Sequence, residues 1–398
     1  MLQGRRTYQI ALSVIICFLL VFTTLLGSLH GVWAKAVVMS EDSGKDSTKS
    51  NSKSKRNRNN NSNRGNRNTK KRYGTTSKNV LMDKNIKQIG EMNSKANNRF
   101  TVKEKPLAFP NNMEEPKRFS FDWKVSPVAL KEEAIMAEEV IRKGEFGWLD
   151  DERVEEIAQI VKQHDMSLDQ ALSLRSALLQ QKTVYGHGRL QSRSKALARL
   201  YKEGVSIVDL SKRFDFPPMN IFRIVLGELR WSKSKIKECL RSPSKLPERE
   251  RKEFEEAEAA DRVSNVDQSE VQVKADKFED ILSDWFEDQG VKLRRQPEMV
   301  REQSAQHGRP VATPDILFLD HVEINGNPVA WIDAKHFYGA DVKFQRKKMA
   351  AQMSRYINEW GSGAVVYRHG FSANLFMPGC TLLDASPLDL SGLSPEGS

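Results

Sequence analysis

Two short segments of the sequence carry side chains that could do chemistry together. Thr313-Pro314-Asp315 precedes one apolar run and Asp333-Ala334-Lys335 follows a second, with the turn signal Asn325-Gly326 between the two runs. Two β-rich runs joined at Asn-Gly predict a hairpin, because both central residues of a type I′ turn need a positive φ. The hairpin would bring Asp315 to the same end of the ladder as Asp333 and Lys335, which share one strand face. Two carboxylates and an ammonium at a strand end suit a divalent metal that activates water against a phosphodiester.

Each of these residues has an expected role. Asp315 and Asp333 would supply hard oxygen ligands for Mg²⁺, with Mn²⁺ as the alternative ion. Lys335 would orient the attacking water or stabilise charge on the phosphate. A plain surface ion pair between Asp333 and Lys335 is the structural alternative. Other catalytic classes find little support, because the sequence has no H-E-x-x-H pair and no G-x-S-x-G elbow. His336 points to the opposite face if the strand continues, and no role is assigned to it.

The same segments resemble a known family. Thr313-Pro314-Asp315, Trp331–Lys335 and Gly361–Tyr367 together are similar to the codanin-interacting nuclease family, the TPD-motif branch of the PD-(D/E)xK nucleases. Asp333 stands where the commoner form of the motif has Glu. The resemblance implies an α/β restriction-endonuclease-like domain with the order helix, strands, hairpin, helix, strand. It also implies a metal-dependent endonuclease that hydrolyses DNA or structured nucleic acid.

Three further residues enter through the resemblance. It implies that Glu279 on the first helix and the Ala334 carbonyl complete the metal site, and that Gln352 on the second helix lies near it. An ordinary solvated glutamate is the alternative for Glu279. A nucleic-acid-binding or codanin-type adaptor that keeps the fold without catalysis is the competing interpretation of the whole chain, so the expected partners are nucleic acid and a codanin-like protein.

Helical stripes are expected on both sides of the hairpin, within a nuclease domain at 271–378. The first stripe has the spacing i, i+3, i+4, i+7, i+8 and predicts a helix with one buried face that ends at Gly290. A second stripe runs from Met349 to Trp360. The stripes consist of Phe278, Ile281, Leu282, Trp285 and Phe286, and of Met349, Met353, Tyr356, Ile357 and Trp360. Residues 379–398 are expected to form a flexible tail.

Residues 126–247 predict an all-α region that contains a helix-turn-helix. Apolar positions at helical spacing are separated by Gly204 and by Asp215-Phe216-Pro217, and Ser206 is placed to cap the middle helix. In a DNA-reading interpretation, the last helix lies in a groove with Asn220, Arg223 and Arg230 outward, supported by the basic Lys212. A three-helix bundle for packing or protein contact is the alternative. Residues 248–270 are acidic and predict a charged linker helix.

The N-terminal third differs in composition. Residues 1–36 predict a signal peptide or signal-anchor, because the apolar stretch at 10–29 follows Arg5-Arg6 and precedes a small-x-small site. Residues 37–125 are basic and rich in Ser and Asn, which predicts a disordered linker or a nucleic-acid-binding or nuclear-localisation patch. The net charge of +11 favours a polyanionic partner or an acidic membrane surface. The N-terminus thus predicts membrane or secretory targeting, whereas the resemblance implies the nucleus.

Overall fold

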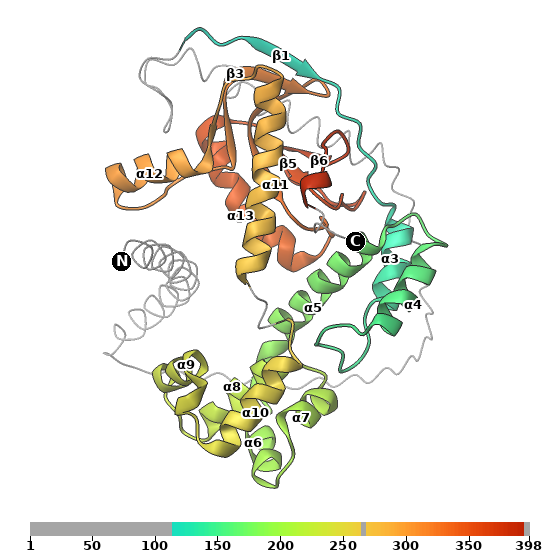
Figure 1. Cartoon of the computed structure of the whole chain (residues 1–398), viewed down its shortest axis with the longest axis vertical. Helices are drawn as coiled ribbons and strands as arrows, with labels where there is room; N and C mark the ends of the chain where they lie inside the picture. Colours follow the sequence, from blue (N-terminus) through green and yellow to red (C-terminus); the bar gives the residue numbers. More distant parts are fainter. Residues whose placement is uncertain (1–113, 264–267, 394–398) are drawn as a thin grey trace, which may run out of the picture. The chain divides into compact units, whose positions relative to one another are not determined.

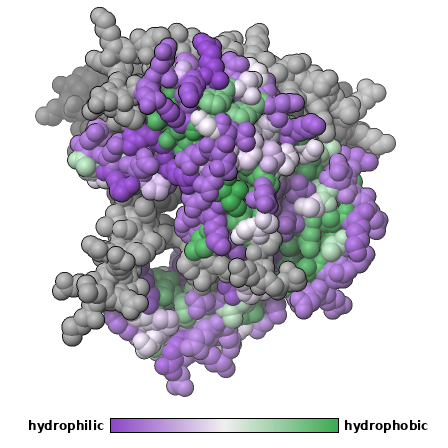
Figure 2. Space-filling model, turned by 45° about the horizontal axis from the view of Figure 1, so that its top comes forward, coloured by the Kyte–Doolittle hydropathy of each residue, from purple (hydrophilic) through white to green (hydrophobic). Residues whose placement is uncertain are grey.

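The computed structural model describes residues 114–263 and 268–393 (Figure 1). The predicted signal or anchor at 1–36, and the part of the 37–125 linker before residue 114, lie outside the described residues. Among the described residues, no helix is both long enough and apolar enough to cross a membrane. On the face shown in Figure 2, these residues are mostly hydrophilic, with smaller apolar patches between them.

A mixed α/β sheet forms the centre of the C-terminal half. Its strand order is β1-β3-β4-β5-β6, and β2 also pairs with β3. β3 runs antiparallel to β2 and β4, whereas β1 is parallel to β3 and β5 is parallel to both β4 and β6. The strands are β1 (Arg118–Phe121), β2 (Leu293–Arg295), β3 (Ile316–Ile324), β4 (Asn327–Lys335), β5 (Gly363–Tyr367) and β6 (Cys380–Asp384).

The predicted hairpin is confirmed. β3 and β4 pair with Ile324 opposite Asn327, which leaves Asn325 and Gly326 as the two turn residues. Their φ angles are 53° and 74°, as a type I′ turn requires. The ladder is irregular between Leu317 and Val322, where the register shifts. This hairpin carries Asp315 and Asp333 to one end of the sheet.

Two helices cover the sheet from opposite faces. α11 (Gln268–Asp288) packs Phe278, Leu282 and Phe286 against Ile332, Ala334 and other residues of one face. α13 (Lys343–Trp360) packs Met349, Met353, Tyr356 and Trp360 against Trp331 and the residues of the other face. Both predicted stripes therefore pack against the sheet, with Ile281, Trp285 and Ile357 only half-buried. α12 (Gln296–His307) links β2 to β3. Gly363 is needed where it stands, because a Cβ there would lie 2.2 Å from the Trp331 ring.

Between β1 and α11 the chain forms a series of helices, from residue 130 to residue 259. They are α3 (Leu130–Glu139), α4 (Asp151–Val161), α5 (Leu168–Gln191), α6 (Ser194–Lys202), α7 (Ile207–Phe214), α8 (Pro218–Glu228), α9 (Lys233–Arg241) and α10 (Glu248–Ala259). A 3₁₀ turn lies within this series at Pro243–Lys245, and another follows β6 at Ser391–Leu393. Ser206 caps α7 as predicted by accepting the Asp209 N–H. α5 reaches the sheet domain, where the Ser173 hydroxyl accepts the Tyr338 N–H at 2.8 Å.

The expected segments differ from the structure at two strands. The linker was expected to run to residue 125, but Arg118–Phe121 forms β1. The flexible tail was expected from residue 379, but Cys380–Asp384 forms β6, which is buried throughout. Both strands are short, and β6 is buried on both faces, so neither shows the alternation that reveals a half-buried strand.

The acidic segment at 248–270 also differs from an exposed linker helix. α10 packs against α7 and α8, and it buries Phe254 and Ala257. These two residues lie three positions apart and form a narrow apolar stripe on an otherwise charged helix. The many Glu residues conceal that stripe in the composition. α10 therefore belongs to the core of the helical region.

Candidate active site

The Asp315 carboxylate joins the ends of the two hairpin strands. Asp315 lies directly before β3 and is buried. Its Oδ2 atom accepts the Ala334 N–H at 2.7 Å, and its Oδ1 atom accepts the Gln296 side-chain N–H at 2.6 Å. Gln296, which begins α12, was not predicted as a site residue from the sequence. Asp315 is thus held in place by donors from both β4 and α12.

Asp333 and Lys335 form an ion pair at the end of β4. The Lys335 Nζ atom contacts the Asp333 Oδ2 atom, which confirms that the two side chains share one face. The Asp333 side chain is 0% exposed and that of Lys335 is 15% exposed. The pair is therefore not the surface ion pair that was the structural alternative. A buried pair of this kind is costly to desolvate and is weak evidence for a stabilising role.

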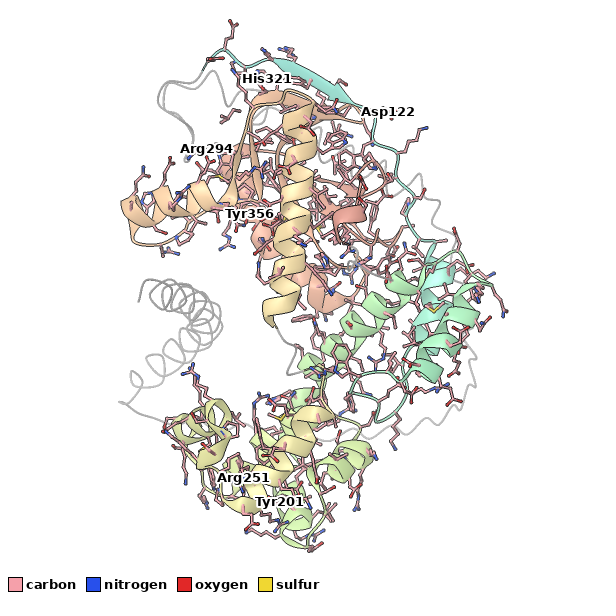
Figure 3. All side chains as sticks on the ribbon, viewed as in Figure 1. Asp122, Tyr201, Arg251, Arg294, His321 and Tyr356 are labelled. Atoms are coloured by element: carbon pink, nitrogen blue, oxygen red, sulfur yellow. The ribbon has the colours of Figure 1, made fainter. Side chains whose placement is uncertain are left out.

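Gln352 and Tyr356 complete the side of the site formed by α13. The Gln352 side-chain N–H donates to Asp333 Oδ1 at 2.9 Å and to the Tyr356 hydroxyl at 3.3 Å. The Tyr356 hydroxyl donates to the Thr313 carbonyl at 3.1 Å. Figure 3 labels Tyr356 among the side chains of the described residues. Gln352 lies where the resemblance implies. Tyr356 was predicted only as a core residue, although its position one helical turn after Gln352 places it on the same face.

Glu279 approaches the group from α11. It is half-buried, and its charge interacts with those of Asp315 and Asp333. Burial and the Asp315 charge raise the pKa of Glu279 to about 8. Burial and the Asp333 charge likewise raise the pKa of Asp315 to about 7. Burial would lower the pKa of Lys335, but Asp333 and Asp315 together raise it above its ordinary value, so the ammonium stays charged.

The donor set of this group fits a hard cation. Glu279, Asp315 and Asp333 offer only oxygen, the type of ligand that Mg²⁺ and Mn²⁺ take. Their raised pKa values share one main cause, burial, which disfavours the charged form, and the charge of a neighbouring carboxylate adds to it for Glu279 and Asp315. Among residues 114–263 and 268–393, however, no three carboxylate, imidazole or thiolate groups are arranged closely enough to hold an ion. The ammonium of Lys335 lies instead against Asp333.

The predicted nucleic-acid-binding residues are placed differently from one another. α8 packs against α6, α7 and α10, and most of its side chains are buried. Asn220 and Arg223 are only partly exposed, and burial lowers the pKa of Arg223. Lys212 and Arg230 are exposed, at the end of α7 and just after α8. A helix covered on most sides cannot enter a DNA groove with its whole face, so this geometry weighs against α8 as a groove-reading helix.

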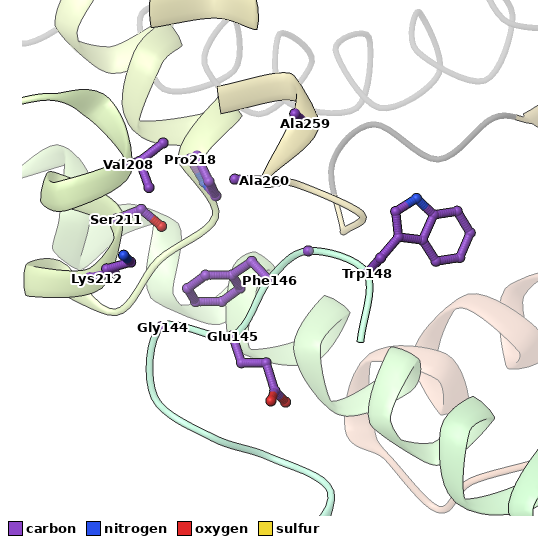
Figure 4. A pocket seen from close by; sticks show the side chains of 11 residues that line it. Gly144, Glu145, Phe146, Trp148, Val208, Ser211, Lys212, Pro218, Ala259 and Ala260 are labelled. Atoms are coloured by element: carbon purple, nitrogen blue, oxygen red, sulfur yellow. The ribbon is translucent and has the colours of Figure 1, made fainter. Parts of the chain in front are cut away.

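A cavity of about 330 Å³ lies within the helical part of the chain (Figure 4). The loop that contains Gly144, Phe146 and Trp148 forms one wall, and α7, α8 and the end of α10 form the other. Of the predicted site residues, Lys212 lines this cavity, and none of the strand-end carboxylates does. The cavity is therefore separate from the candidate active site.

Comparison with known proteins gives one match. A family model described as "Protein of unknown function TPD sequence-motif" matches residues 246–385. The match covers the hairpin, α11, α13 and the strands β5 and β6, together with α10. No curated protein and no solved structure matches the chain. The match thus identifies a TPD-motif segment at the candidate site, and its printed description names no activity.

Proposed function

We propose that the chain is a Mg²⁺-dependent nuclease of the PD-(D/E)xK type that hydrolyses phosphodiester bonds of DNA or structured nucleic acid. One observation carries the proposal: Glu279, Asp315 and Asp333, from α11, the residue before β3, and β4, interact through their charges with one another and with the ammonium of Lys335, which contacts Asp333. When all three carboxylates are ionised, their charge exceeds that of the one lysine, and burial makes this excess costly. A divalent cation would provide it.

The order of the elements supports the same proposal. α11, β2, β3, β4, α13 and β5 follow one another as helix, strand, hairpin, helix and strand. β2, β3 and β4 are antiparallel neighbours, and β5 returns parallel to β4 after α13. This is the order that the resemblance to PD-(D/E)xK nucleases implies. α12 and the strands β1 and β6 are additions to it.

Each side chain has a role in the proposed reaction. Asp315, Asp333, Glu279 and the Ala334 carbonyl would hold the metal, which supplies Lewis acidity and a water of lowered pKa. Gln352 fixes Asp333 through its hydrogen bond, and Tyr356 fixes Gln352 in turn. Lys335 would stabilise negative charge on the phosphate, and its raised pKa keeps it protonated for that task.

Metal binding would weaken the contact between Lys335 and Asp333. The Asp333 Oδ2 atom contacts the ammonium and its Oδ1 atom accepts from Gln352, so a divalent ion bound to this carboxylate would lie close to the ammonium and repel it. Release of the ammonium from Asp333 would free it to turn toward a phosphate. Lys335 would then have two positions, one on Asp333 and one on the substrate.

A non-catalytic adaptor is the second candidate function. The observation that favours it is the closed Lys335–Asp333 ion pair, which already provides one countercharge to the group. In that case the carboxylates serve the fold alone, and addition of Mg²⁺ would change neither stability nor nucleic-acid processing.

The test uses the full chain, because a fragment that starts near residue 265 would lack β1 and Trp123, which belong to the sheet and its core. Cleavage of labelled DNA and Mg²⁺ binding by isothermal titration are measured for the wild type and for Asp315→Asn/Asp333→Asn. Asp280→Asn/Asp284→Asn is the matched control, since it removes two exposed carboxylates from neighbouring α11 positions. We expect the first double variant to lose both activities and the control to keep both. Wild-type protein that binds no Mg²⁺ and leaves every substrate intact would favour the adaptor.

A further inference from the structure

Arg368 lies beside the candidate active site on the neighbouring strand. It follows β5 directly, and Tyr367 of β5 is paired in register with Lys335. The Arg368 N–H donates to the Lys335 carbonyl at 2.9 Å. The backbones of Lys335 and Arg368 are therefore hydrogen-bonded to each other where β4 and β5 end, on the same side of the sheet.

The side chain of Arg368 lies on the opposite face of the sheet from that of Lys335. Tyr367 packs with the residues that α13 covers, whereas Val366 and Ala334 pack with those that α11 covers. The guanidinium group of Arg368 reaches His336, which also alternates to the α11 face. The His336 ring lies 6.3 Å from that of Phe278, the residue before Glu279. Arg368 thus lies on the α11 face of the sheet, the face from which Glu279 comes.

The hydrogen bond to His336 fixes the direction of the guanidinium group. An arginine side chain only donates, so the Nε2 atom of His336 must accept, and the imidazole is neutral. Within the part of the chain that the structure describes, this is the only hydrogen bond of the Arg368 side chain, and it uses Nη1. Nε and Nη2 therefore keep donors for another acceptor.

The charge of Arg368 is not balanced by a carboxylate. In residues 114–263 and 268–393 it makes no ion pair, whereas Arg153, Arg294 and Arg295 each contact two or more acidic side chains. The Asp169 charge reaches Arg368, but Asp169 is 73% exposed and pairs with His369. Arg368 is itself half-buried. A half-buried guanidinium that makes no ion pair within the described part of the chain, and that is oriented by a neutral acceptor, is arranged to bind an oxyanion from outside the chain.

We propose that Arg368 binds a phosphate of the nucleic-acid substrate other than the one that is cleaved, and that His336 is its positioning residue. This inference rests on the proposed nuclease function. Lys335 and Arg368 stand on adjacent strand ends, with Lys335 directed to the scissile phosphate. A guanidinium fork suits phosphate geometry better than an ammonium does, which explains the use of Arg at a position where no chemistry occurs.

The test measures binding of oligonucleotides to the full chain with Ca²⁺ in place of Mg²⁺, after a gel has shown that the strand stays intact. Arg368→Ala should weaken binding about tenfold and reduce the slope of log affinity against log salt by about one. His336→Ala keeps the charge and loses the orientation, so it should weaken binding by a smaller factor and leave the slope unchanged. Arg142→Ala is the matched control, because Arg142 is exposed and already paired with Glu156.

Two oligonucleotides, one with a 5′-phosphate and one without, distinguish the sources of the phosphate. If Arg368→Ala weakens the binding of both oligonucleotides equally, Arg368 binds an internal phosphate. If it weakens only the binding of the 5′-phosphorylated oligonucleotide, Arg368 binds the terminal phosphate. Thermal unfolding and Mg²⁺ titration of Arg368→Ala must match the wild type, and Arg368→Lys should recover the salt slope but only part of the affinity.

If Arg368→Ala binds oligonucleotides with the wild-type affinity and the wild-type salt slope, and still cleaves DNA, this inference is overturned and the proposed function stands. A wild-type protein that binds Mg²⁺ but no oligonucleotide would overturn both.

Discussion

α11 contributes carboxylates to two charged clusters that have the same number of acidic and basic side chains but differ in their exposure to solvent. The strand-end cluster consists of Glu279, Asp315, Asp333 and Lys335, and the surface cluster consists of Asp280, Asp284, Glu287 and Arg295. Each has three carboxylates and one cation. In the surface cluster the carboxylates are 69%, 61% and 45% exposed, and all three contact Arg295 directly. In the strand-end cluster Asp333 is 0% exposed, and Lys335 contacts it alone by ion pairing.

The difference shows that burial, and not the number of charges, sets these clusters apart. Water and counterions screen the surface cluster, so its excess negative charge costs little. The strand-end cluster is less screened, because Asp315 and Asp333 are buried and Glu279 is half-buried, and the pKa values of Asp315 and Glu279 rise to about 7 and about 8. Glu279 and Asp280 are neighbours in the sequence, yet they belong to different clusters. Strongly shifted carboxylates at a strand end are candidates for function in a way that their exposed neighbours are not.

The largest expected difference between the clusters concerns their cations. Lys335→Ala should reduce cleavage by about 10²–10³-fold, since it removes charge stabilisation at the phosphate. It should still bind Mg²⁺, and at least as tightly as the wild type, because the ammonium no longer competes for Asp333. Single-turnover cleavage and isothermal titration measure the two effects separately, with Arg295→Ala as the control. Cleavage by Lys335→Ala at the wild-type rate would remove the catalytic assignment at its most specific residue.

A smaller effect is expected from two adjacent carboxylates of α11. Glu279→Gln should weaken Mg²⁺ binding by about tenfold, because a neutral amide replaces one oxygen ligand near the ion. Asp280→Asn should leave Mg²⁺ binding unchanged, since Asp280 faces Arg295 in solvent. Titration of both variants at one ionic strength makes the comparison. Equal affinities for the two variants would place Glu279 among the ordinary solvated residues.

The pH dependence of stability should also distinguish the clusters. The raised pKa values of Asp315 and Glu279 mean that the folded protein binds protons at higher pH than the unfolded chain does. Their stabilising contribution is thus fully present below the unfolded-state pKa values of about 4, and it is lost as pH rises through the folded values. In EDTA, the unfolding temperature should fall between pH 5 and pH 8 as these groups ionise.

Glu279→Gln should flatten that decline, and saturating Mg²⁺ should oppose it by stabilising the ionised carboxylates. Asp280→Asn should leave the decline as it is in the wild type. Scanning calorimetry or dye-monitored melting across this pH range gives the readout. A wild-type unfolding temperature that rises from pH 5 to pH 8 in EDTA would contradict the raised pKa values.

The smallest effect is expected for the cation of the surface cluster. Arg295→Ala should lower the free energy of unfolding by about 0.5–1 kcal/mol, the range of partly exposed ion pairs. Cleavage and Mg²⁺ affinity should not change. Urea unfolding provides the measurement, and the loss should shrink at high salt. A loss several times larger would show that the surface cluster holds α11 in place, and the contrast with the strand-end cluster would be weaker than proposed.

The sequence by itself determined the parts of the site that follow from local rules. Asn325-Gly326 predicts the turn, and strand alternation places Asp333 and Lys335 on one face, because a type I′ turn and a pleated strand depend on a few adjacent residues. Helical spacing likewise predicts the buried stripes of α11 and α13. The resemblance implied the positions of Glu279 and Gln352.

Only the tertiary structure decided which side chains surround those residues and how deeply they are buried. Gln296 donates to Asp315 from α12, and the Arg368 backbone N–H donates to Lys335 from the end of β5, although no spacing in the sequence connects these pairs. The Trp123 side-chain N–H donates to the Asp384 carbonyl, so segments from the two ends of the described chain close one core. A pKa is set by burial and neighbouring charge, which depend on contacts between distant residues. The sequence therefore shows which residues of α11 are acidic, whereas only the fold shows that Glu279 belongs to the buried strand-end cluster and Asp280 to the solvent-screened surface cluster.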